Sequence, residues 1–523
     1  MDNEFHCPLL LYTRCIILNY IKSFFSRQKK EKNPPLAEPI SPQKSGKPLV
    51  QTAPKRDNGV VPKKNSKKAA HTPPHILHQQ FTVNAADYGI SLKHFPQNAI
   101  NIVNKLLNHG YQAYIVGGCI RDLLLGKPAK DFDIATNARP EEIQKIFGRQ
   151  CRIIGRRFRL AHIVYGREIY EVATFRAEHH RNSNDRMSKT SETGMLLRDN
   201  VYGTMREDAE RRDFSVNALY FDVKRQLIFD FFNGIKDLRA GKLTLIGDPV
   251  VRYQEDPVRM LRAIRFMAKL DMFLEKSSDA PIRQMAHLLK AIPPARLFDE
   301  SLKLLQSGCG FKTYQLLRQY GLFEQLFPVL APYFTERNDS QSEKMIAKAL
   351  NSTDERIRDN LRVNPAFLFA ALLWYPLREK IDELKNEGGL NSYDAMMLAA
   401  NDILAESNRA VALHRRHTAV IRDIWALQFQ FPKRTEKRAK QTLAHIKFRA
   451  GFDLLVMRAE IEGGDLVELS AWWHEFQFSN DNQRHDILQN VRTPPSFREE
   501  QPKRKRKPCR RFSRAKKPTR GEH

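Results

Sequence analysis

Two aspartates separated by one residue, Asp131 and Asp133, lie in the segment DFDIATNA of this 523-residue chain. On a strand, residues two apart share a face, so both carboxylates would project together while Phe132 and Ile134 pack into a core. The two negative charges repel each other, and a bound cation removes that repulsion. Oxygen ligands without Cys or His favour Mg²⁺ or Mn²⁺. The pair therefore predicts a metal site, which a third acid would complete.

Two acids further along the chain are candidates for that third ligand. Glu171 lies in the alternating segment YEVATFR, which predicts a neighbouring strand with Glu171 on its polar side. Asp213, in RRDFSVNAL, is the other candidate. Asp213 would alternatively cap a helix that begins at Phe214 and orient Arg212 or Asn217. The sequence leaves open whether Glu171 or Asp213 completes the metal site.

A glycine turn precedes the aspartates in the segment AYIVGGCIRDLLLG. Gly117 and Gly118 let the backbone approach a ligand closely, and a helix that begins there aims free N–H groups at an anion. Arg121, one turn into that helix, would reach the same anion, or it would pair with Asp122 in an ordinary strand-to-helix turn. A triphosphate site beside a two-metal site is an arrangement for nucleotidyl transfer.

A polar stripe follows more than a hundred residues downstream, in EDPVRMLRAIRF. Asp256 is expected to be the N-cap of a helix whose first residue is Pro257. Polar side chains then recur every three residues, and the intervening apolar ones fall on another face. Taken alone, this spacing fits a salt-bridged surface equally well. The stripe consists of Asp256, Arg259, Arg262 and Arg265.

The elements that must position these residues change type along the chain. Between residues 90 and 248, apolar and polar residues alternate as in strands, which predicts an α+β domain on a mixed sheet. Residues 177–210 are polar and are expected to form a loop between strands. From Asp256 to about residue 478 helical patterns follow one another, so the second half is predicted to be all-α.

The charge of the chain predicts a polyanionic partner, either nucleic acid or an anionic membrane surface. Lys and Arg number 87 against 59 Asp and Glu, and eleven of the basic residues lie between Lys503 and Arg520. The six cysteines are scattered without a C-x-x-C pair, which favours a reducing cytoplasm.

The amino terminus has an apolar run that Arg14 and Lys22 interrupt, and a spanning helix needs about 20 apolar residues. No transmembrane span is therefore expected. Residues 16–30 would form either a basic amphipathic helix in peripheral contact with a membrane or a frayed terminal helix, or they would precede a later true start codon.

Taken together, GGCIRDLLLG, DFDIATNA, RRDFSVNAL and EDPVRMLRAIRF resemble the successive motifs of the class II nucleotidyltransferases. This superfamily comprises the bacterial poly(A) polymerases and the CCA-adding tRNA nucleotidyltransferases. The resemblance covers about residues 90 to 480. Within it, IIGRRFRLAHI at Ile153–Ile163, the helix RVNPAFLFAALLWYP and the basic tail are similar to the bacterial poly(A) polymerase I family.

The resemblance implies a set of roles for the residues above. Asp131 and Asp133 would hold the metals, Asp213 would be essential to catalysis, and Glu171 would be the family's strand carboxylate. The helix after Asp256 would select the incoming base. The residues expected to bind the nucleotide are Gly117, Gly118, Arg121, Arg212, Asn217, Asp256, Arg259, Arg262 and Arg265.

The resemblance also implies an activity and partners. The expected activity is template-independent addition of AMP from ATP to RNA 3′ ends with Mg²⁺ or Mn²⁺, in contact with the RNA-decay machinery. A CCA-adding enzyme, which would use CTP as well as ATP, is the first alternative. A non-catalytic RNA-binding scaffold is the second.

Five regions are predicted. Residues 1–85 are a basic and mostly disordered extension, 86–248 the nucleotidyltransferase domain, and 249–310 a helical neck for base recognition and RNA binding. Residues 311–480 are an all-helical RNA-binding body, and 481–523 a disordered basic tail.

Overall fold

The structure is a computed structural model that describes residues 81–155, 159–177, 188–190, 196–199 and 201–489. The chain divides into two compact units. Unit 1 comprises Met1–Tyr333, Leu350–Val363 and Ile403–His414, and unit 2 comprises Phe334–Ala349, Asn364–Asp402 and Arg415–His523. The predictions for residues 16–30 and for the basic run after Lys503 lie outside the described residues.

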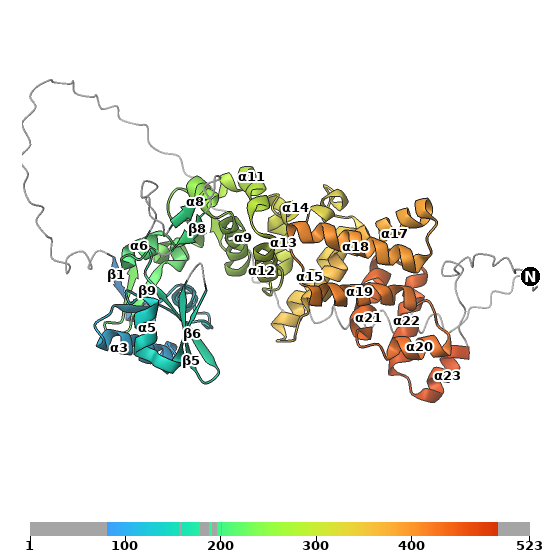
Figure 1. Cartoon of the computed structure of the whole chain (residues 1–523), viewed down its shortest axis with the longest axis horizontal. Coiled ribbons are helices and arrows are strands. Elements are labelled where there is room, and N and C mark those ends of the chain that lie inside the picture. Colours follow the sequence, from blue (N-terminus) through green and yellow to red (C-terminus); the bar gives the residue numbers. More distant parts are fainter. Residues whose placement is uncertain (1–80, 156–158, 178–187, 191–195, 200, 490–523) are drawn as a thin grey trace, which may run out of the picture. The chain divides into compact units, whose positions relative to one another are not determined.

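An eight-stranded mixed sheet is the centre of the first part of unit 1 (Figure 1), which confirms the predicted sheet. The strand order is β1-β10-β9-β2-β3-β6-β5-β4; β3 and β6 run parallel, and the other neighbours are antiparallel. The strands are β1 Thr82–Asn84, β2 Ala113–Val116, β3 Asp133–Thr136, β4 Cys151–Ile154, β5 Leu160–Tyr165, β6 Glu168–Thr174, β9 Leu219–Asp222 and β10 Leu227–Asp230.

The sheet begins earlier than the sequence suggested. Strand β1 pairs with β10, with Thr82 opposite Phe229, so residues 82–84 belong to the sheet and not to the disordered extension predicted for 1–85. Strand β1 is three residues long, too short to be distinguished from a linker by alternation.

Helices pack on the sheet through their apolar sides. In α3, Gln97–Asn108, five apolar residues at helical spacing are buried, as expected from the segment. Short helices α4 Gly118–Leu124, α5 Pro140–Phe147, α6 Met205–Glu210 and α7 Gly234–Arg239 complete this region, together with the 3₁₀ turns Ala85–Tyr88, Leu92–His94, Gly148–Gln150 and Ser215–Asn217.

The predicted loop 177–210 is wrong in part. It contains α6 and the two-stranded pair β7 Ser188–Thr190 and β8 Leu196–Asp199. The helix begins with a capping box, in which Thr204 accepts from the Glu207 amide and Glu207 accepts from the Thr204 amide. Met205 and Ala209 then pack in the core with Phe175 and Tyr220.

The rest of unit 1 is mainly helical. It contains α8 Pro249–Glu255, α9 Val258–Leu270, α10 Lys276–Asp279, α11 Pro281–Met285, α12 Pro294–Leu305, α13 Gly310–Gln319 and α14 Phe323–Leu326, with 3₁₀ turns at Ala286–Ala291 and Pro328–Tyr333. One small parallel pair, β11 Lys242–Leu243 with β12 Phe273–Leu274, interrupts the helices.

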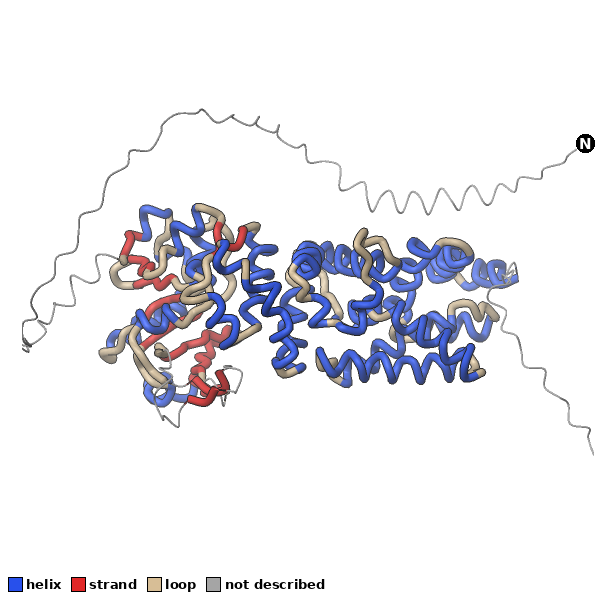
Figure 2. The backbone as a smooth tube through the Cα atoms, turned by 90° about the horizontal axis from the view of Figure 1, so that it is seen from above, coloured by secondary structure: helices blue, strands red, loops and turns tan. Residues whose placement is uncertain are grey.

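The described residues of unit 2 form helices and connecting loops without a strand, which confirms the predicted all-α second half. Figure 2 shows the strands confined to one end of the described chain. Its helices are α16 Pro365–Leu372, α17 Trp374–Gly388, α19 Arg415–Gln430, α20 Glu436–Leu443, α21 Phe448–Glu462, α22 Asp465–Phe478 and α23 Asp481–Gln489; α15 Gln341–Arg358 and α18 Ser392–Ala410 belong to both units. Helix α23 corrects the predicted disordered tail at residues 481–489.

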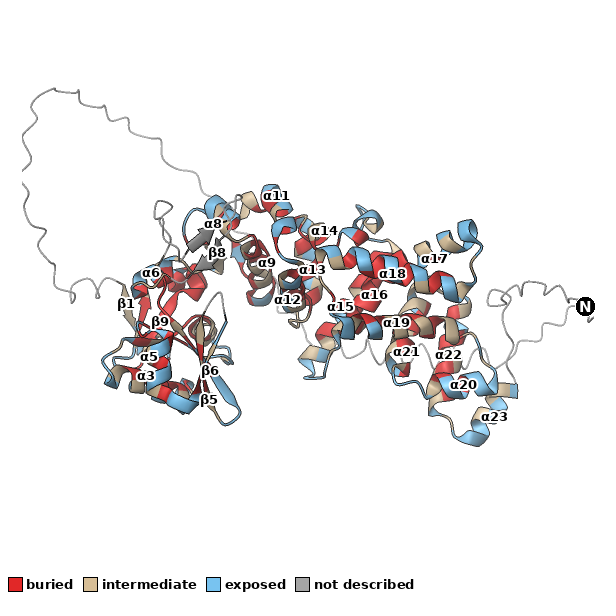
Figure 3. Cartoon of the chain, viewed as in Figure 1, coloured by how far each residue is buried: buried red, intermediate tan, exposed pale blue. Residues whose placement is uncertain are grey.

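The core of unit 2 holds large aromatic side chains, and Figure 3 shows buried residues along its helices. Trp425 and Trp473 are fully buried, and their indole nitrogens donate to the carbonyl oxygens of Ala370 and Phe431 over 2.9 Å each. Within the described residues, no helix is both long and apolar enough to cross a membrane.

Candidate active site

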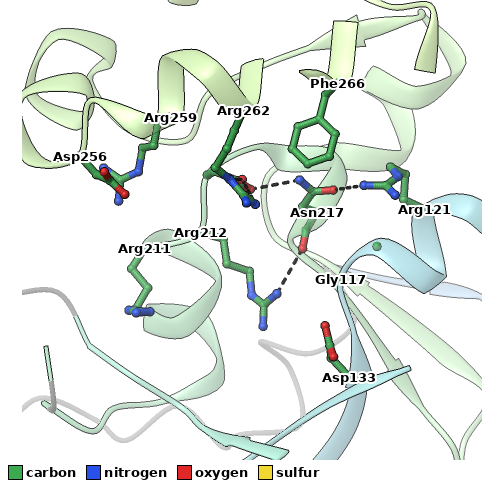
Figure 4. A pocket seen from close by; sticks show the side chains of 12 residues that line it. Gly117, Arg121, Asp133, Arg211, Arg212, Asn217, Asp256, Arg259, Arg262 and Phe266 are labelled. Carbon is green, nitrogen blue, oxygen red and sulfur yellow. Dashed lines mark hydrogen bonds and ion pairs between the residues drawn. The ribbon is translucent and has the colours of Figure 1, made fainter. Parts of the chain in front are cut away.

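A pocket of about 350 Å³ lies between the sheet and α9, within unit 1 (Figure 4). It brings together most of the residues that the sequence had singled out, although they come from three distant segments. Its lining is Gly117, Gly118, Arg121, Asp133, Arg211, Arg212, Asp213, Asn217, Asp256, Arg259, Arg262 and Phe266. Asp131, Glu171 and Arg265 were predicted for the site but are not part of this lining.

The glycine turn makes room for an arginine. Gly117 has φ 83° and ψ −134°, a conformation open to glycine, and a Cβ there would lie 3.4 Å from Arg212 Nη1. The Gly117 amide donates to the Leu219 carbonyl over 3.0 Å. The Gly117 N–H is thus bound to the sheet, so the amides predicted to face an anion would be those of α4, which begins at Gly118.

Arg121 pairs with Asp122, as one of the two predictions for it held, and it also lines the pocket. It is 5% exposed, and its Nε donates to Asp122 over 2.8 Å, as in an ordinary strand-to-helix turn. Its Nη1 also donates to Asn217 Oδ1 over 2.6 Å, which fixes the guanidinium on the pocket wall (Figure 4).

Asp213 joins the sheet side of the pocket to α9. Its Oδ1 accepts from the Phe214 amide at 2.8 Å and from Asn217 Nδ2 at 3.1 Å, and its Oδ2 accepts from Arg262 Nε at 2.7 Å. Burial alone would raise the pKa of Asp213, but the Arg262 charge and these hydrogen bonds outweigh it and lower the pKa to about 2. Asp213 is therefore ionised, and both of its oxygens are engaged by protein donors.

Asp133 is the first residue of β3, at the edge of the pocket. Although the side chain is exposed at the pocket, desolvation by the surrounding protein raises the pKa of Asp133 to about 6; the negative charges of Glu171 and Asp131 add to the effect, while Arg212 opposes it. Asp131 is exposed and precedes β3, so the two aspartates do not share the strand as predicted.

Glu171 lies beside Asp133 on the neighbouring strand, because the parallel register of β3 and β6 aligns Ile134 with Val172. Its side chain is 51% exposed, and its Oε1 lies 3.4 Å from His162 Nε2. Among the described residues, no group of three or more His, Cys, Asp or Glu side chains is already gathered in a metal-binding arrangement. Asp131, Asp133 and Glu171 are therefore neighbours, but their side chains are not arranged around a common metal position.

The start of α9 differs from the prediction by one residue. The helix begins at Val258 with Pro257 as its N-cap, yet Asp256 Oδ1 still accepts from the Val258 amide over 3.2 Å. Asp256 Oδ2 accepts from Arg296 over 2.7 Å.

Two members of the predicted stripe on α9 point to different surroundings. Arg259 Nη1 donates to Glu255 over 3.0 Å, within the pocket wall. Arg265 faces Glu300 on α12, with 3.9 Å between Nη1 and Oε2.

Sequence reasoning missed two lining residues, Arg211 and Phe266. Both directly adjoin predicted residues, in RRD and in AIRF, so adjacency was the available signal. The guanidinium carbons of Arg121, Arg262 and Arg265 lie 5.4, 5.5 and 5.2 Å from the centre of the Phe266 ring. This ring thus contacts a cluster of three cations.

The segment Ile153–Ile163 includes the end of β4 and the start of β5, at the far edge of the sheet order from β1. Residues 156–158 lie outside the described residues. His162 on β5 pairs across the strands with Glu171, so the segment adjoins the carboxylates and not the lining of the pocket.

Three family models match the chain. They are described as the poly A polymerase head domain, at residues 113–244, the probable RNA and SrmB-binding site of polymerase A, at 271–334, and the polymerase A arginine-rich C-terminus, at 388–511. A poly(A) polymerase I of Haemophilus influenzae is 63% identical over 452 residues, which are 86% of this chain and 99% of the relative. This chain belongs to the poly(A) polymerase I family.

More distant relatives match less of the chain. A CCA-adding enzyme of Lactococcus lactis is 37% identical over 228 residues, 43% of this chain and 54% of the relative. A solved tRNA-processing enzyme in an apo form has a TM-score of 0.50 at 22% identity, and the match covers 76% of this chain and 97% of that one. The solved structure supports the family fold alone.

Proposed function

We propose that the pocket of this chain transfers AMP from ATP to RNA 3′ ends without a template, with release of diphosphate, and so builds poly(A) tails that promote RNA processing and decay. The observation that carries this function is the 63% identity to a poly(A) polymerase I over 99% of that relative. The CCA-adding relative matches 43% of the chain, which favours the polymerase over that alternative.

The charge of the pocket suits a triphosphate. Five arginines line it together with three aspartates, and two of the aspartates are paired with arginines. Fixed guanidinium groups are the side chains best matched to phosphate oxygens. In the proposed reaction the RNA 3′ hydroxyl attacks the α-phosphorus in line, while Arg121 and Arg212 hold the β- and γ-phosphates.

A divalent cation, Mg²⁺ or Mn²⁺, is proposed to bind Asp131, Asp133 and Glu171. The donor set fits, because all three are carboxylates and their mutual repulsion contributes to the raised pKa of Asp133. Asp213 is the poorer third ligand, since its Oδ1 already accepts two hydrogen bonds and its Oδ2 is held by Arg262. When bound, the cation would stabilise negative charge on the reacting oxygens. Asp213 instead is proposed to act by fixing Arg262 and Asn217.

Base selection is proposed to use Asp256 and Arg259. An Asp that accepts from the exocyclic amine and an Arg that donates to a ring nitrogen would recognise adenine, and would leave the polar groups of uracil or guanine unpaired. Cytosine presents a similar edge. These two residues therefore support a choice of ATP or CTP, and the choice between those two must come from elsewhere.

The remaining proposals concern partners and location. Basic residues after Lys503 would add phosphate contacts to RNA, and contact with the RNA-decay machinery is a further proposal. A cytoplasmic location is supported by Cys119, Cys151 and Cys309, which are free thiols in the described residues.

Nucleotide choice tests the proposal. Purified protein is incubated with a short generic RNA and each of the four nucleoside triphosphates separately, with Mg²⁺. Long tails from ATP alone are expected. Addition of CMP restricted to a tRNA that lacks its CCA end would favour the CCA-adding alternative, and RNA binding without any extension would favour the scaffold.

A further inference from the structure

Two buried side chains outside the pocket lining hold the guanidinium of Arg212. Tyr220 donates its hydroxyl proton to Asp208 Oδ2 over 2.7 Å and accepts from Arg212 Nε over 2.9 Å. Arg212 Nη2 donates to the same Asp208 oxygen over 3.2 Å. The three groups form a closed ring of hydrogen bonds, and Tyr220 and Asp208 are 0% and 5% exposed.

The ring joins three elements that the fold must bring together. Asp208 lies on α6, Tyr220 on β9, and Arg212 between α6 and the 3₁₀ turn Ser215–Asn217. Asp208 is held in turn by the Arg176 amide, which donates to its Oδ1 over 3.2 Å. A buried carboxylate is stable when its oxygens accept several hydrogen bonds, so this arrangement is fixed before any ligand arrives.

Charge balance keeps Arg212 ionised within this ring. Burial lowers the pKa of Arg212, but the neighbouring Tyr220 and Asp208 more than compensate, so the net shift is upward. The Tyr220 hydroxyl both donates and accepts, so it links the Asp208 carboxylate to the Arg212 guanidinium. The buried negative charge of Asp208 offsets the positive charge of Arg212.

One nitrogen of Arg212 is left to face the pocket. Nη1 donates a long hydrogen bond of 3.4 Å to the Asn217 carbonyl oxygen, and it lies 3.4 Å from the position of a Cβ on Gly117. Figure 4 shows the guanidinium lying between Asn217 and Asp133. The ring thus engages Nε and Nη2, while Nη1 gives one N–H to Asn217 and has a second N–H to offer to the cavity.

We propose that Asp208 and Tyr220 are positioning residues for nucleotide binding, which orient Arg212 so that Nη1 donates to a phosphate oxygen of ATP. This inference rests on the proposed function, since it assumes that the pocket binds a triphosphate. Neither residue touches the nucleotide, and both act through Arg212.

The test is Tyr220→Phe, which removes one hydroxyl and keeps the ring. The matched control is Tyr253→Phe, because Tyr253 is also fully buried in unit 1 and donates over 2.8 Å to a backbone carbonyl, that of Ser278. We expect Tyr220→Phe to raise the KM for ATP by about three- to tenfold, with the KM for RNA unchanged, because a misplaced charge-assisted donor loses part of its contribution. Asp208→Asn should act in the same direction.

A double-mutant cycle separates positioning from general destabilisation. In an Arg212→Ala background, Tyr220→Phe should change the KM for ATP by less than about 1.5-fold, since the side chain through which it acts is gone. The inference would be overturned if Tyr220→Phe changed the KM for ATP by the same factor in the wild-type and Arg212→Ala backgrounds. An equal rise in the KM for ATP in Tyr253→Phe would overturn it as well.

ATP affinity by calorimetry, without RNA, repeats this comparison independently of extension. If the wild-type protein extends no RNA, the proposed function is refuted. If Tyr220→Phe still lowers the affinity for ATP in that case, the positioning role of Tyr220 stands.

Discussion

Asp213→Asn should destabilise unit 1 in a pH-dependent way. The folded pKa is about 2, against about 3.9 for an unfolded Asp, and this difference corresponds to about 2–3 kcal/mol of stability at pH 7. Because the folded pKa is depressed, that stability is present above the unfolded pKa and is lost as pH falls through the folded one. At pH 3 about half of it should remain. The Asn variant carries no charge at this position at any pH. The difference in stability between the wild type and the variant should therefore shrink as the pH falls.

Urea denaturation followed by far-UV circular dichroism measures this deficit. All four tryptophans, Trp374, Trp425, Trp472 and Trp473, lie in unit 2, so tryptophan fluorescence does not report unit 1 directly. Asp248→Asn is the matched control, because Asp248 caps α8 by accepting from the Val251 amide over 3.0 Å and Asn is an equally good N-cap. The electrostatic explanation would be refuted if Asp213→Asn were as stable as Asp248→Asn at pH 7. It would also be refuted if the loss of stability in Asp213→Asn grew as the pH fell to 3.

Further predictions concern the turn, the tail and the metal. Gly117→Ala should cost about 1–2 kcal/mol of stability, since its φ is 83°, and should raise the KM for ATP because relief of that strain would shift the turn beside Arg212; unchanged melting and kinetics would contradict this. Deleting residues 501–523 should weaken RNA binding in a filter assay, with a loss that shrinks as salt rises; a salt-independent loss would indicate a structural role. Chelating divalent ions should stop RNA extension, with recovery on adding Mg²⁺ or Mn²⁺; extension in excess chelator would exclude the metal proposal.

Short-range patterns in the sequence predicted the parts of the site that depend on neighbouring residues. Strand alternation predicted that Asp133 lies on a strand, which β3 confirms, and the RRD segment placed Arg212 and Asp213 close to Asn217. Such features follow from periodicity and from contacts within a few residues.

Arg265 shows where a periodic pattern loses its meaning. Each step of three residues turns about 300° around a helix, so a three-residue stripe drifts by about 60° per step. Arg259 and Arg265 are thereby about 120° apart, and Arg265 faces Glu300 and not the pocket. The stripe predicted polarity correctly but not a shared direction.

The ring of Asp208, Arg212 and Tyr220 was out of reach for another reason. It requires α6 and β9 to meet, and that meeting depends on the strand order of the sheet. The T-x-x-E pattern of the α6 capping box, Thr204 with Glu207, is present in the sequence. The polar composition of the surrounding residues nevertheless favoured a loop over a helix. Local signals do not determine which elements become neighbours.

The pocket beside Asp133 is proposed to perform the adenylyl transfer, and Asp133→Ala tests this assignment most directly. RNA extension from ATP and RNA affinity are measured on the same preparations, with Asp222→Ala as the control, because Asp222 ends β9 in the same sheet and binds only nearby backbone amides among the contacts described. We expect Asp133→Ala to lower extension by about a thousandfold or more while RNA affinity stays within about twofold. Tails of normal length from Asp133→Ala would contradict the assignment of the active site.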